Sequence, residues 1–193
     1  MAIYVTSDAH GHVRALDEAL SKISLTSDDT LYVLGDMIDR GPDPVGVIKL
    51  VRSLPNAHVL KGNHEQIMLD AIIGQDPLDA ETWDINGGWT TREQLNDMEF
   101  EAYEELVRWM AALPLYAVVE TAERPYLLVH AGIQTEAARA FLLEHGVLRW
   151  VPIASCCSRC SRYSRPMTCC GFVTAIGMCR PGCFLPRVRA RSL

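Results

Sequence analysis

The sequence predicts an α/β fold, in which short buried strands alternate with helices. Strands are expected at 2–7, 30–34 and 57–61, because these segments are short runs rich in apolar and β-branched residues. Helices are expected at 13–23, 43–54 and 65–73, and the first two carry apolar residues at helical spacing. A strand that is repeatedly followed by a helix is typical of α/β domains.

The following part of the chain is expected to add further helices and strands. Residues 74–90 contain Gly74, Pro77 and the pair Gly87-Gly88, so we expect them to be irregular. The later expected elements are helices at 91–97, 100–112 and 134–145 and strands at 115–120 and 126–130. Neither strand alternation nor helical spacing continues beyond Trp150, which predicts that the folded core lies in residues 1–150.

Length and composition are typical of one globular domain. The chain has 193 residues, of which 49% are hydrophobic and 22% are charged. No apolar run approaches the roughly 18 residues of a membrane-spanning helix. The first strand has no basic segment before it and runs directly into a polar motif, which argues against a secretion signal. We therefore expect a cytoplasmic protein without a membrane partner.

Charge is distributed unevenly along the chain. Residues 1–150 hold all 24 acidic residues and 11 of the 18 basic ones, which gives them a net charge of −13. Residues 151–193 hold seven Arg and no acidic residue. A protein that binds nucleic acid needs a basic face toward the phosphate backbone. The acidic body therefore argues against nucleic acid as a partner.

Polar residues with metal-binding side chains follow the predicted strands. They are Asp8 and His10 after the first strand, Asp36, Asp39 and Arg40 after the second, Asn63 and His64 after the third, and His130 at the end of a later one. The carboxyl ends of strands in an α/β sheet open onto one crevice, so these side chains are expected to meet. They offer oxygen and nitrogen donors without sulfur, a set that suits Mn²⁺, Fe or Zn²⁺.

Four ordered motifs resemble those of the calcineurin-like metallophosphoesterases. They are D-x-H at 8–10, G-D-x-x-D-R-G at 35–41, G-N-H-E at 62–65 and H-A-G at 130–132. Within the family, segments 62–69 (GNHEQIML) and 86–89 (NGGW) look most like the bacterial and phage-type serine/threonine protein phosphatases, whose relatives include symmetrical dinucleoside tetraphosphatases. The resemblance covers about residues 1–150 and implies a β-sandwich flanked by helices.

The resemblance also implies a site with two divalent metal ions, either Mn, Fe or Zn. The implied ligands are Asp8 and His10 for one ion, Asn63 and His130 for the other, and Asp36 as the bridge between them. A hydroxide between the metals would attack phosphorus in line, and His64, oriented by Asp39, would protonate the leaving oxygen. Arg40 and Asn63 would bind the substrate phosphate.

The implied reaction is hydrolysis of phosphomonoesters, with phosphoserine or phosphothreonine in proteins as the expected substrate. Dinucleoside polyphosphates remain an alternative, because their cleavage would use the same metals. A catalytically impaired remnant that only binds phosphate is a further alternative, because two features of the family are missing. Pro152 stands where the family has an arginine after Trp150, and no histidine follows His145 to provide a further ligand of the second metal. We therefore expect low activity or poor solubility of this chain.

Residues 151–193 are expected to lie outside the family fold, which would leave the second sheet incomplete. They are rich in Cys, Arg, Ser and Pro, and they contain no Asp, Glu, Lys, Asn, Gln or His. We interpret this abrupt change as translation in a shifted reading frame. The alternative is a zinc site, formed by two cysteine pairs that 18 residues separate: Cys157 with Cys160, and Cys179 with Cys183.

Overall fold

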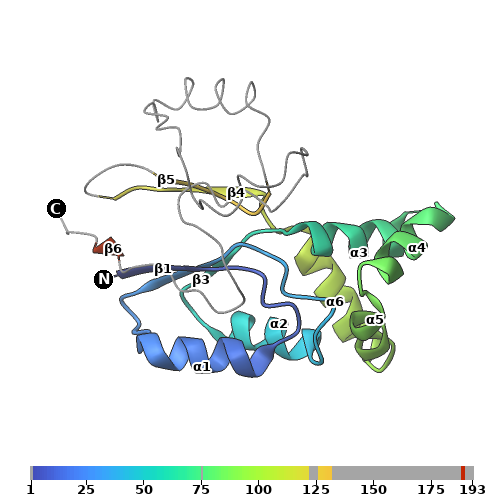
Figure 1. Cartoon of the computed structure of the whole chain (residues 1–193), viewed down its shortest axis with the longest axis horizontal. Coiled ribbons are helices and arrows are strands. Elements are labelled where there is room, and N and C mark those ends of the chain that lie inside the picture. Colours follow the sequence, from blue (N-terminus) through green and yellow to red (C-terminus); the bar gives the residue numbers. More distant parts are fainter. Residues whose placement is uncertain (1, 75, 122–125, 132–187, 190–193) are drawn as a thin grey trace, which may run out of the picture.

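A computed structural model of the chain describes residues 2–74, 76–121, 126–131 and 188–189. These residues form two sheets with helices packed against the larger one (Figure 1). The larger sheet has the strand order β3-β2-β1-β6, and the smaller sheet pairs β4 with β5. The strands are β1 (Ala2–Thr6), β2 (Thr30–Val33), β3 (Ala57–Val59), β4 (Tyr116–Val119), β5 (Tyr126–Val129) and β6 (Val188–Arg189).

The parallel arrangement of β1, β2 and β3 confirms the expected α/β fold. Strand β1 pairs with β2 and β2 pairs with β3, both in parallel, whereas β6 pairs antiparallel with β1. Helix α1 (Val13–Ile23) connects β1 to β2, and α2 (Pro44–Ser53) connects β2 to β3. The three parallel strands therefore end at the same edge of the sheet, and the loops that follow them begin there.

Apolar side chains cover both faces of the larger sheet. One face packs on α1 and α2 through buried residues, among them Tyr4, Leu31, Val33, Leu16, Leu20, Val47 and Ile48. On the other face, Leu34 and Leu60 form a second cluster with Val119 of β4 and Leu128 of β5. Figure 1 shows β4 and β5 on that side and α1 and α2 on the opposite side. The complete sandwich remains a prediction, because the residues after 131 lie outside the described part apart from β6.

Four further helices follow β3 within the described residues, and one of them corrects the expected structure. They are α3 (Asn63–Ile73), α4 (Pro77–Ile85), α5 (Trp89–Asn96) and α6 (Phe100–Ala111). The expectation that 74–90 would be irregular is wrong, because α4 occupies most of this segment. The side chain of Asp76 caps α4 by accepting from the amide of Leu78, and Pro77 occupies the first turn. Trp83 is the buried residue of α4, so the helix shows little apolar periodicity.

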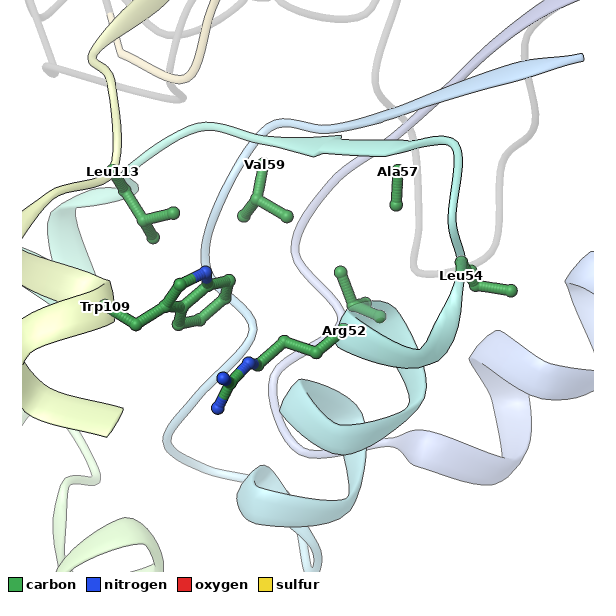
Figure 2. Close-up of a pocket in the computed structure, with 7 residues that line it drawn as sticks. Arg52, Leu54, Ala57, Val59, Trp109 and Leu113 are labelled. Carbon is green, nitrogen blue, oxygen red and sulfur yellow. The ribbon is translucent and has the colours of Figure 1, made fainter. Parts of the chain in front are cut away.

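An open pocket of about 220 Å³ lies on the helical side of the sheet. Its lining residues are Val51, Arg52, Leu54, Ala57, Val59, Trp109 and Leu113 (Figure 2). The guanidinium of Arg52 lies 5.2 Å from the centre of the Trp109 ring, so one wall is cationic and aromatic. None of the predicted site residues lines this pocket.

Among the described residues, no helix has the length and apolar character that crossing a membrane requires.

Asp29 ties the start of β1 to the loop before β2. Its carboxylate accepts hydrogen bonds from the amide of Ala2 and from the amide and hydroxyl of Thr26. The hydrogen bonds from Thr26 hold the pKa of this carboxyl below its ordinary value. A carboxyl with a lowered folded-state pKa stabilises the fold above its unfolded-state pKa, and this contribution is lost as the pH falls through the lowered value.

We therefore expect Asp29→Asn to lower the free energy of unfolding at neutral pH. The difference from the unchanged protein should shrink in acid, where the native carboxyl is protonated as well. Urea unfolding across a pH series measures this, and Asp28→Asn is the matched control because Asp28 is the exposed neighbour. A difference that stays constant with pH would contradict the assigned role of the charge.

Candidate active site

The loops that follow β1, β2 and β3 lie against one another at the carboxyl edge of the sheet. The amides of Asp8 and His10 donate to the carbonyls of Gly35 and Asp36 at 3.1 and 2.9 Å. Gly35 has a φ of 95°, and a Cβ there would lie 2.3 Å from the nitrogen of Gly62. Only glycine fits this contact between the second and third loops. Three segments that are distant in sequence therefore present their side chains to one place.

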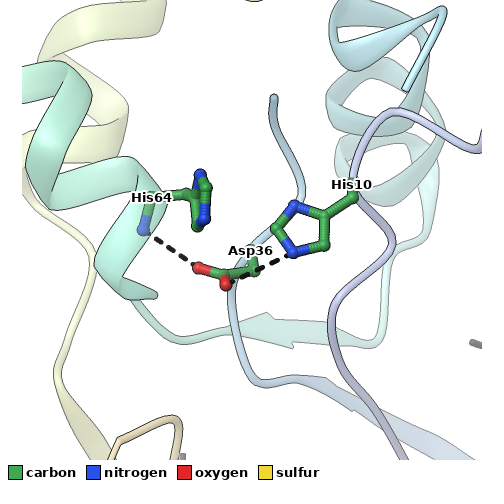
Figure 3. Close-up of side chains that lie close together, drawn as sticks. All are labelled: His10, Asp36 and His64. Carbon is green, nitrogen blue, oxygen red and sulfur yellow. Dashed lines mark hydrogen bonds and ion pairs between the residues drawn. The ribbon is translucent and has the colours of Figure 1, made fainter. Parts of the chain in front are cut away.

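Asp36 lies at the centre of this place and directs one carboxylate oxygen to each side. Its Oδ2 is 3.6 Å from Nε2 of His10, and its Oδ1 is 3.4 Å from Nε2 of His130. The Nδ1 of His10 lies 2.9 Å from the carbonyl of Ile38, which fixes the ring with Nε2 toward Asp36. Figure 3 shows Asp36 between the His10 ring and the backbone of His64. A carboxylate with its oxygens aimed at two histidines has the arrangement that a bridging ligand requires.

Asp8 and Asn63 extend the two sides of the cluster. Asp8 Oδ1 lies 3.9 Å from Nε2 of His10, and Asn63 Oδ1 lies 2.8 Å from Nε2 of His130. The donor atoms of Asp8, Asp36 and His130 also lie within 4.8 Å of one another. Asp8 is therefore close to both sides, and its assignment to a single metal stays a prediction.

The donor set fits divalent cations. Burial alone would raise the pKa of Asp36, but hydrogen bonds from His130 and from the amide of His64 lower it overall, so the group is held as a carboxylate. The same carboxylate raises the pKa of His130 in spite of burial. Burial, as the largest cause, lowers the pKa of His10 and favours the neutral ring that binds metals. Carboxylate, amide and imidazole donors close to one another match the ligands of Mn²⁺, Fe or Zn²⁺.

Glu65 locks two of the site loops together, a role that its place in the G-N-H-E motif did not reveal. It is fully buried, and its carboxylate accepts from the amides of Asp36, Met37 and Gly62 at 2.8, 2.7 and 2.8 Å. Burial raises the pKa of this carboxyl, and the nearby charge of Asp36 adds to the shift. Three backbone amides would lack a partner without it, so the position of Asp36 depends on Glu65.

We expect Glu65→Gln to destabilise the fold and weaken metal binding together. A glutamine can accept through one atom only, and its amide group would face a backbone N–H, so at least one amide loses its partner. Each such loss costs about 1–3 kcal/mol. Urea unfolding and Mn²⁺ titration by calorimetry measure the two effects, with Glu18→Gln on the exposed face of α1 as the control. Unchanged Mn²⁺ affinity would show that Glu65 does not set the position of Asp36.

His64, Asp39 and Arg40 form a second group beside Asp36. His64 and Asp39 are both fully buried, and Nδ1 of the ring lies 2.7 Å from Oδ2 of the carboxylate. The exposed Arg40 places its Nη1 3.0 Å from Nε2 of His10 and its Nη2 2.7 Å from Nε2 of His64. The predicted pair is therefore in contact, and the predicted phosphate-binding arginine lies across two imidazoles.

The backbone of the site is strained where its side chains converge. Six described non-glycine residues have a positive φ: Asp8, His10, Ser24, Asp36, Asp39 and Arg40. Five of these are predicted site residues, and the sixth ends α1. Left-handed conformations cost roughly 1–3 kcal/mol each for such residues and cluster at functional sites. Most of the strained backbone positions therefore carry side chains of the predicted site.

Sequence reasoning missed two residues that contact Asp39, namely Trp83 and Thr91. Both donate to its carboxylate. Trp83 lies in the segment expected to be irregular, and neither residue belongs to the four motifs.

Other predictions fall outside the described residues: the helix at 134–145, the tail boundary at 150 and the zinc site of Cys157, Cys160, Cys179 and Cys183.

Comparison with known proteins agrees with the four motifs. Residues 1–164 match the family model described as calcineurin-like phosphoesterase. The symmetrical bis(5'-nucleosyl)-tetraphosphatases of Erwinia tasmaniensis and Proteus mirabilis are 31% identical over 136 residues and 33% identical over 138 residues. Each alignment covers 69% of this chain and 45% of the relative, so this chain spans a little under half the length of these proteins.

A solved structure supports the fold. A protein serine/threonine phosphatase from Saccharomyces cerevisiae superposes with a TM-score of 0.53 at 21% identity, over 69% of this chain and 39% of that one. At this identity the likeness bears on the fold alone. Together with the family match over residues 1–164 and the clustered aspartates and histidines, it supports one conclusion: this chain belongs to the calcineurin-like phosphoesterases, a family of metal-dependent hydrolases.

Proposed function

We propose that this chain carries the metal-binding part of a hydrolase that cleaves dinucleoside polyphosphates. Relatives at 31% and 33% identity bear the name of symmetrical bis(5'-nucleosyl)-tetraphosphatase, which supports this substrate class over the phosphoserine or phosphothreonine expected from the motifs alone. The likeness to a protein phosphatase, at 21% identity, concerns the fold and does not favour a protein substrate.

The observation that carries the proposal is the position of Asp36. Its two oxygens lie 3.6 and 3.4 Å from histidines on opposite sides, with Asp8 and Asn63 beside them. We assign Asp8 and His10 to one divalent ion, Asn63 and His130 to another, and Asp36 to both. Bound ions would polarise the phosphate and make water acidic enough to supply hydroxide at neutral pH.

The side chains around this cluster suit the remaining tasks of a hydrolase. Because Asp39 accepts from Nδ1 of His64, Nε2 is the ring nitrogen that would face the leaving oxygen, and a ring protonated on both nitrogens could deliver its Nε2 proton there. Arg40 now donates to that Nε2, and its exposed guanidinium can turn to a phosphate instead. Binding of the substrate phosphate would thus draw Arg40 away and release Nε2 for proton transfer.

The test compares two substrates on the full chain with Mn²⁺. We expect diadenosine tetraphosphate to be cleaved to ADP with a higher kcat/KM than a phosphoserine peptide. Chromatography of the nucleotides and release of inorganic phosphate measure the two reactions. Faster turnover of the peptide would overturn the proposed substrate class. Tight binding of either compound without turnover would overturn the hydrolase proposal and leave the phosphate-binding remnant.

A further inference from the structure

Both oxygens of the Asp39 carboxylate accept hydrogen bonds, and His64 contacts only one of them. Its Oδ2 meets Nδ1 of His64 at 2.7 Å. Its Oδ1 accepts from Nε1 of Trp83 at 3.0 Å and from the hydroxyl of Thr91 at 2.6 Å. Trp83 is 3% exposed and Thr91 is 0% exposed, so water does not compete for these contacts.

The donor and acceptor roles in this network leave little freedom. An indole nitrogen can only donate, so Trp83 requires an acceptor at Oδ1. The hydroxyl oxygen of Thr91 accepts from the amide of Asp39 at 2.9 Å, and its single proton is therefore directed to Oδ1. With Oδ1 saturated by two donors, Oδ2 is turned to His64 and accepts its Nδ1 proton. The other ring nitrogen, Nε2, then accepts from Nη2 of Arg40 at 2.7 Å, a contact that favours the same tautomer.

We propose that Trp83 and Thr91 are positioning residues, which act through Asp39 to fix the orientation and the tautomer of His64. They come from α4 and α5, helices that contribute none of the predicted metal ligands. The effect on turnover rests on the proposed function, because it requires His64 to be the proton donor. The effect on the tautomer does not depend on any reaction.

The local backbone is shaped around this contact. A Cβ at Gly88 would lie 2.2 Å from Cδ1 and 2.3 Å from Nε1 of Trp83, so the indole can reach Asp39 only past a glycine. At the preceding residue of this turn, the carbonyl of Gly87 accepts from the amide of Arg40 at 3.0 Å. The same turn therefore supports both the indole and the loop that carries Asp39 and Arg40.

The rival explanation is that Trp83 and Thr91 only fill space under α4 and α5. A residue that only fills space changes stability when it is replaced, but it leaves the tautomer of a nearby histidine unaltered. Trp83→Phe removes the donor and keeps most of the ring, and Thr91→Val removes the hydroxyl at similar size. Thr91→Ser keeps the hydroxyl and should rescue the effect.

Nitrogen-15 NMR of the histidine side chains in the full metal-free chain is the first measurement. We expect His64 to be protonated at Nδ1 in the unchanged protein and in Thr91→Ser. In Trp83→Phe and Thr91→Val the Nε2-protonated tautomer should appear in measurable proportion in spite of the Arg40 contact to Nε2, because a carboxylate that is no longer held at Oδ1 binds Nδ1 less firmly. The controls are Thr90→Val, whose hydroxyl contacts the carbonyl of Gly87 instead of Asp39, and Trp109→Phe, whose indole lines the pocket of Figure 2.

Turnover of two aryl phosphates is the second measurement. Misplacing a proton donor should cost about 10- to 100-fold in kcat on phenyl phosphate, a poor leaving group, and far less on 4-nitrophenyl phosphate. KM should change little. This difference between the two leaving groups separates positioning from general loss of structure, because partial unfolding lowers the turnover of both substrates to the same extent.

The outcomes are distinguishable. An unchanged His64 tautomer in both Trp83→Phe and Thr91→Val overturns the positioning proposal, and so does an equal shift in the two controls. If the tautomer shifts as expected but His64→Asn itself shows no leaving-group dependence, the positioning proposal stands and the assignment of His64 as proton donor fails. Should Thr91→Val not fold, Trp83→Phe alone decides the tautomer result.

Discussion

Asp36→Asn should abolish two-metal binding, because it changes the side chain that faces both halves of the site. An asparagine keeps Oδ1, which can still accept from the amide of His64 at 3.0 Å, but it replaces Oδ2 with an amide group that cannot bind a cation. The loss of Oδ2 removes one ligand on the His10 side, and the loss of the carboxylate removes the negative charge on both sides. We expect the affinity for Mn²⁺ to fall by more than about 100-fold.

Asparagine is also the mildest replacement for the backbone at this position. Asp36 has a φ of 53°, and asparagine tolerates the left-handed region better than other non-glycine residues. Asp36→Asn should therefore fold, and any loss of affinity can be assigned to the carboxylate. Circular dichroism of the metal-free protein checks this point.

The measurement is the rise in Tm on adding Mn²⁺, together with the metal content by mass spectrometry. A ligand that binds only the folded state raises stability in proportion to the logarithm of its concentration over Kd. The rise should be large in the unchanged protein and in Asp17→Asn, an exposed control on α1, and nearly absent in Asp36→Asn. Two metal ions retained by Asp36→Asn would disprove the bridging assignment.

The sequence predicted the α/β alternation and the convergence of the loops for a physical reason. Strands β1, β2 and β3 are short, mostly apolar runs, and the polar residues of the motifs follow each of them within a few positions, so the ligands lie near the strand ends in the chain. The expected helix at 13–23 agrees with α1 residue for residue. His10, Asp36 and His64 are brought together because adjacent parallel strands end at one edge of the sheet.

The parts that the sequence did not predict depend on contacts between distant side chains. Helix α4 has an N-terminal cap but little apolar periodicity, so the spacing of apolar residues does not predict it. The bonds from Trp83 and Thr91 to Asp39 join residues 44 and 52 positions apart, and no local pattern records them. The position of Arg40 across two imidazoles is likewise a property of the assembled site.

His64→Asn should lower kcat for phenyl phosphate by about 10²–10⁴-fold, the usual contribution of a positioned proton donor. The ring is fully buried, its Nδ1 is bonded to Asp39, and its Nε2 points to the side of the cluster where Arg40 lies. An asparagine can still donate to Asp39 but has no group that delivers a proton to the leaving oxygen. Mn²⁺ content should stay at the level of the unchanged protein, because the proposed ligands are intact. A loss of metal equal to the loss of activity would make His64 a ligand instead.

The pair of His64 and Asp39 can be tested as a unit by adding Asp39→Asn and the double variant. Asparagine tolerates the φ of 68° at this position, but its amide group would oppose the Nδ1 proton of His64 and favour the wrong tautomer. If Asp39 acts only through His64, the double variant should be no slower than His64→Asn alone, since a residue cannot orient a ring that is absent. Effects that multiply in the double variant would mean that Asp39 contributes through another route, such as the helices α4 and α5 to which Trp83 and Thr91 connect it.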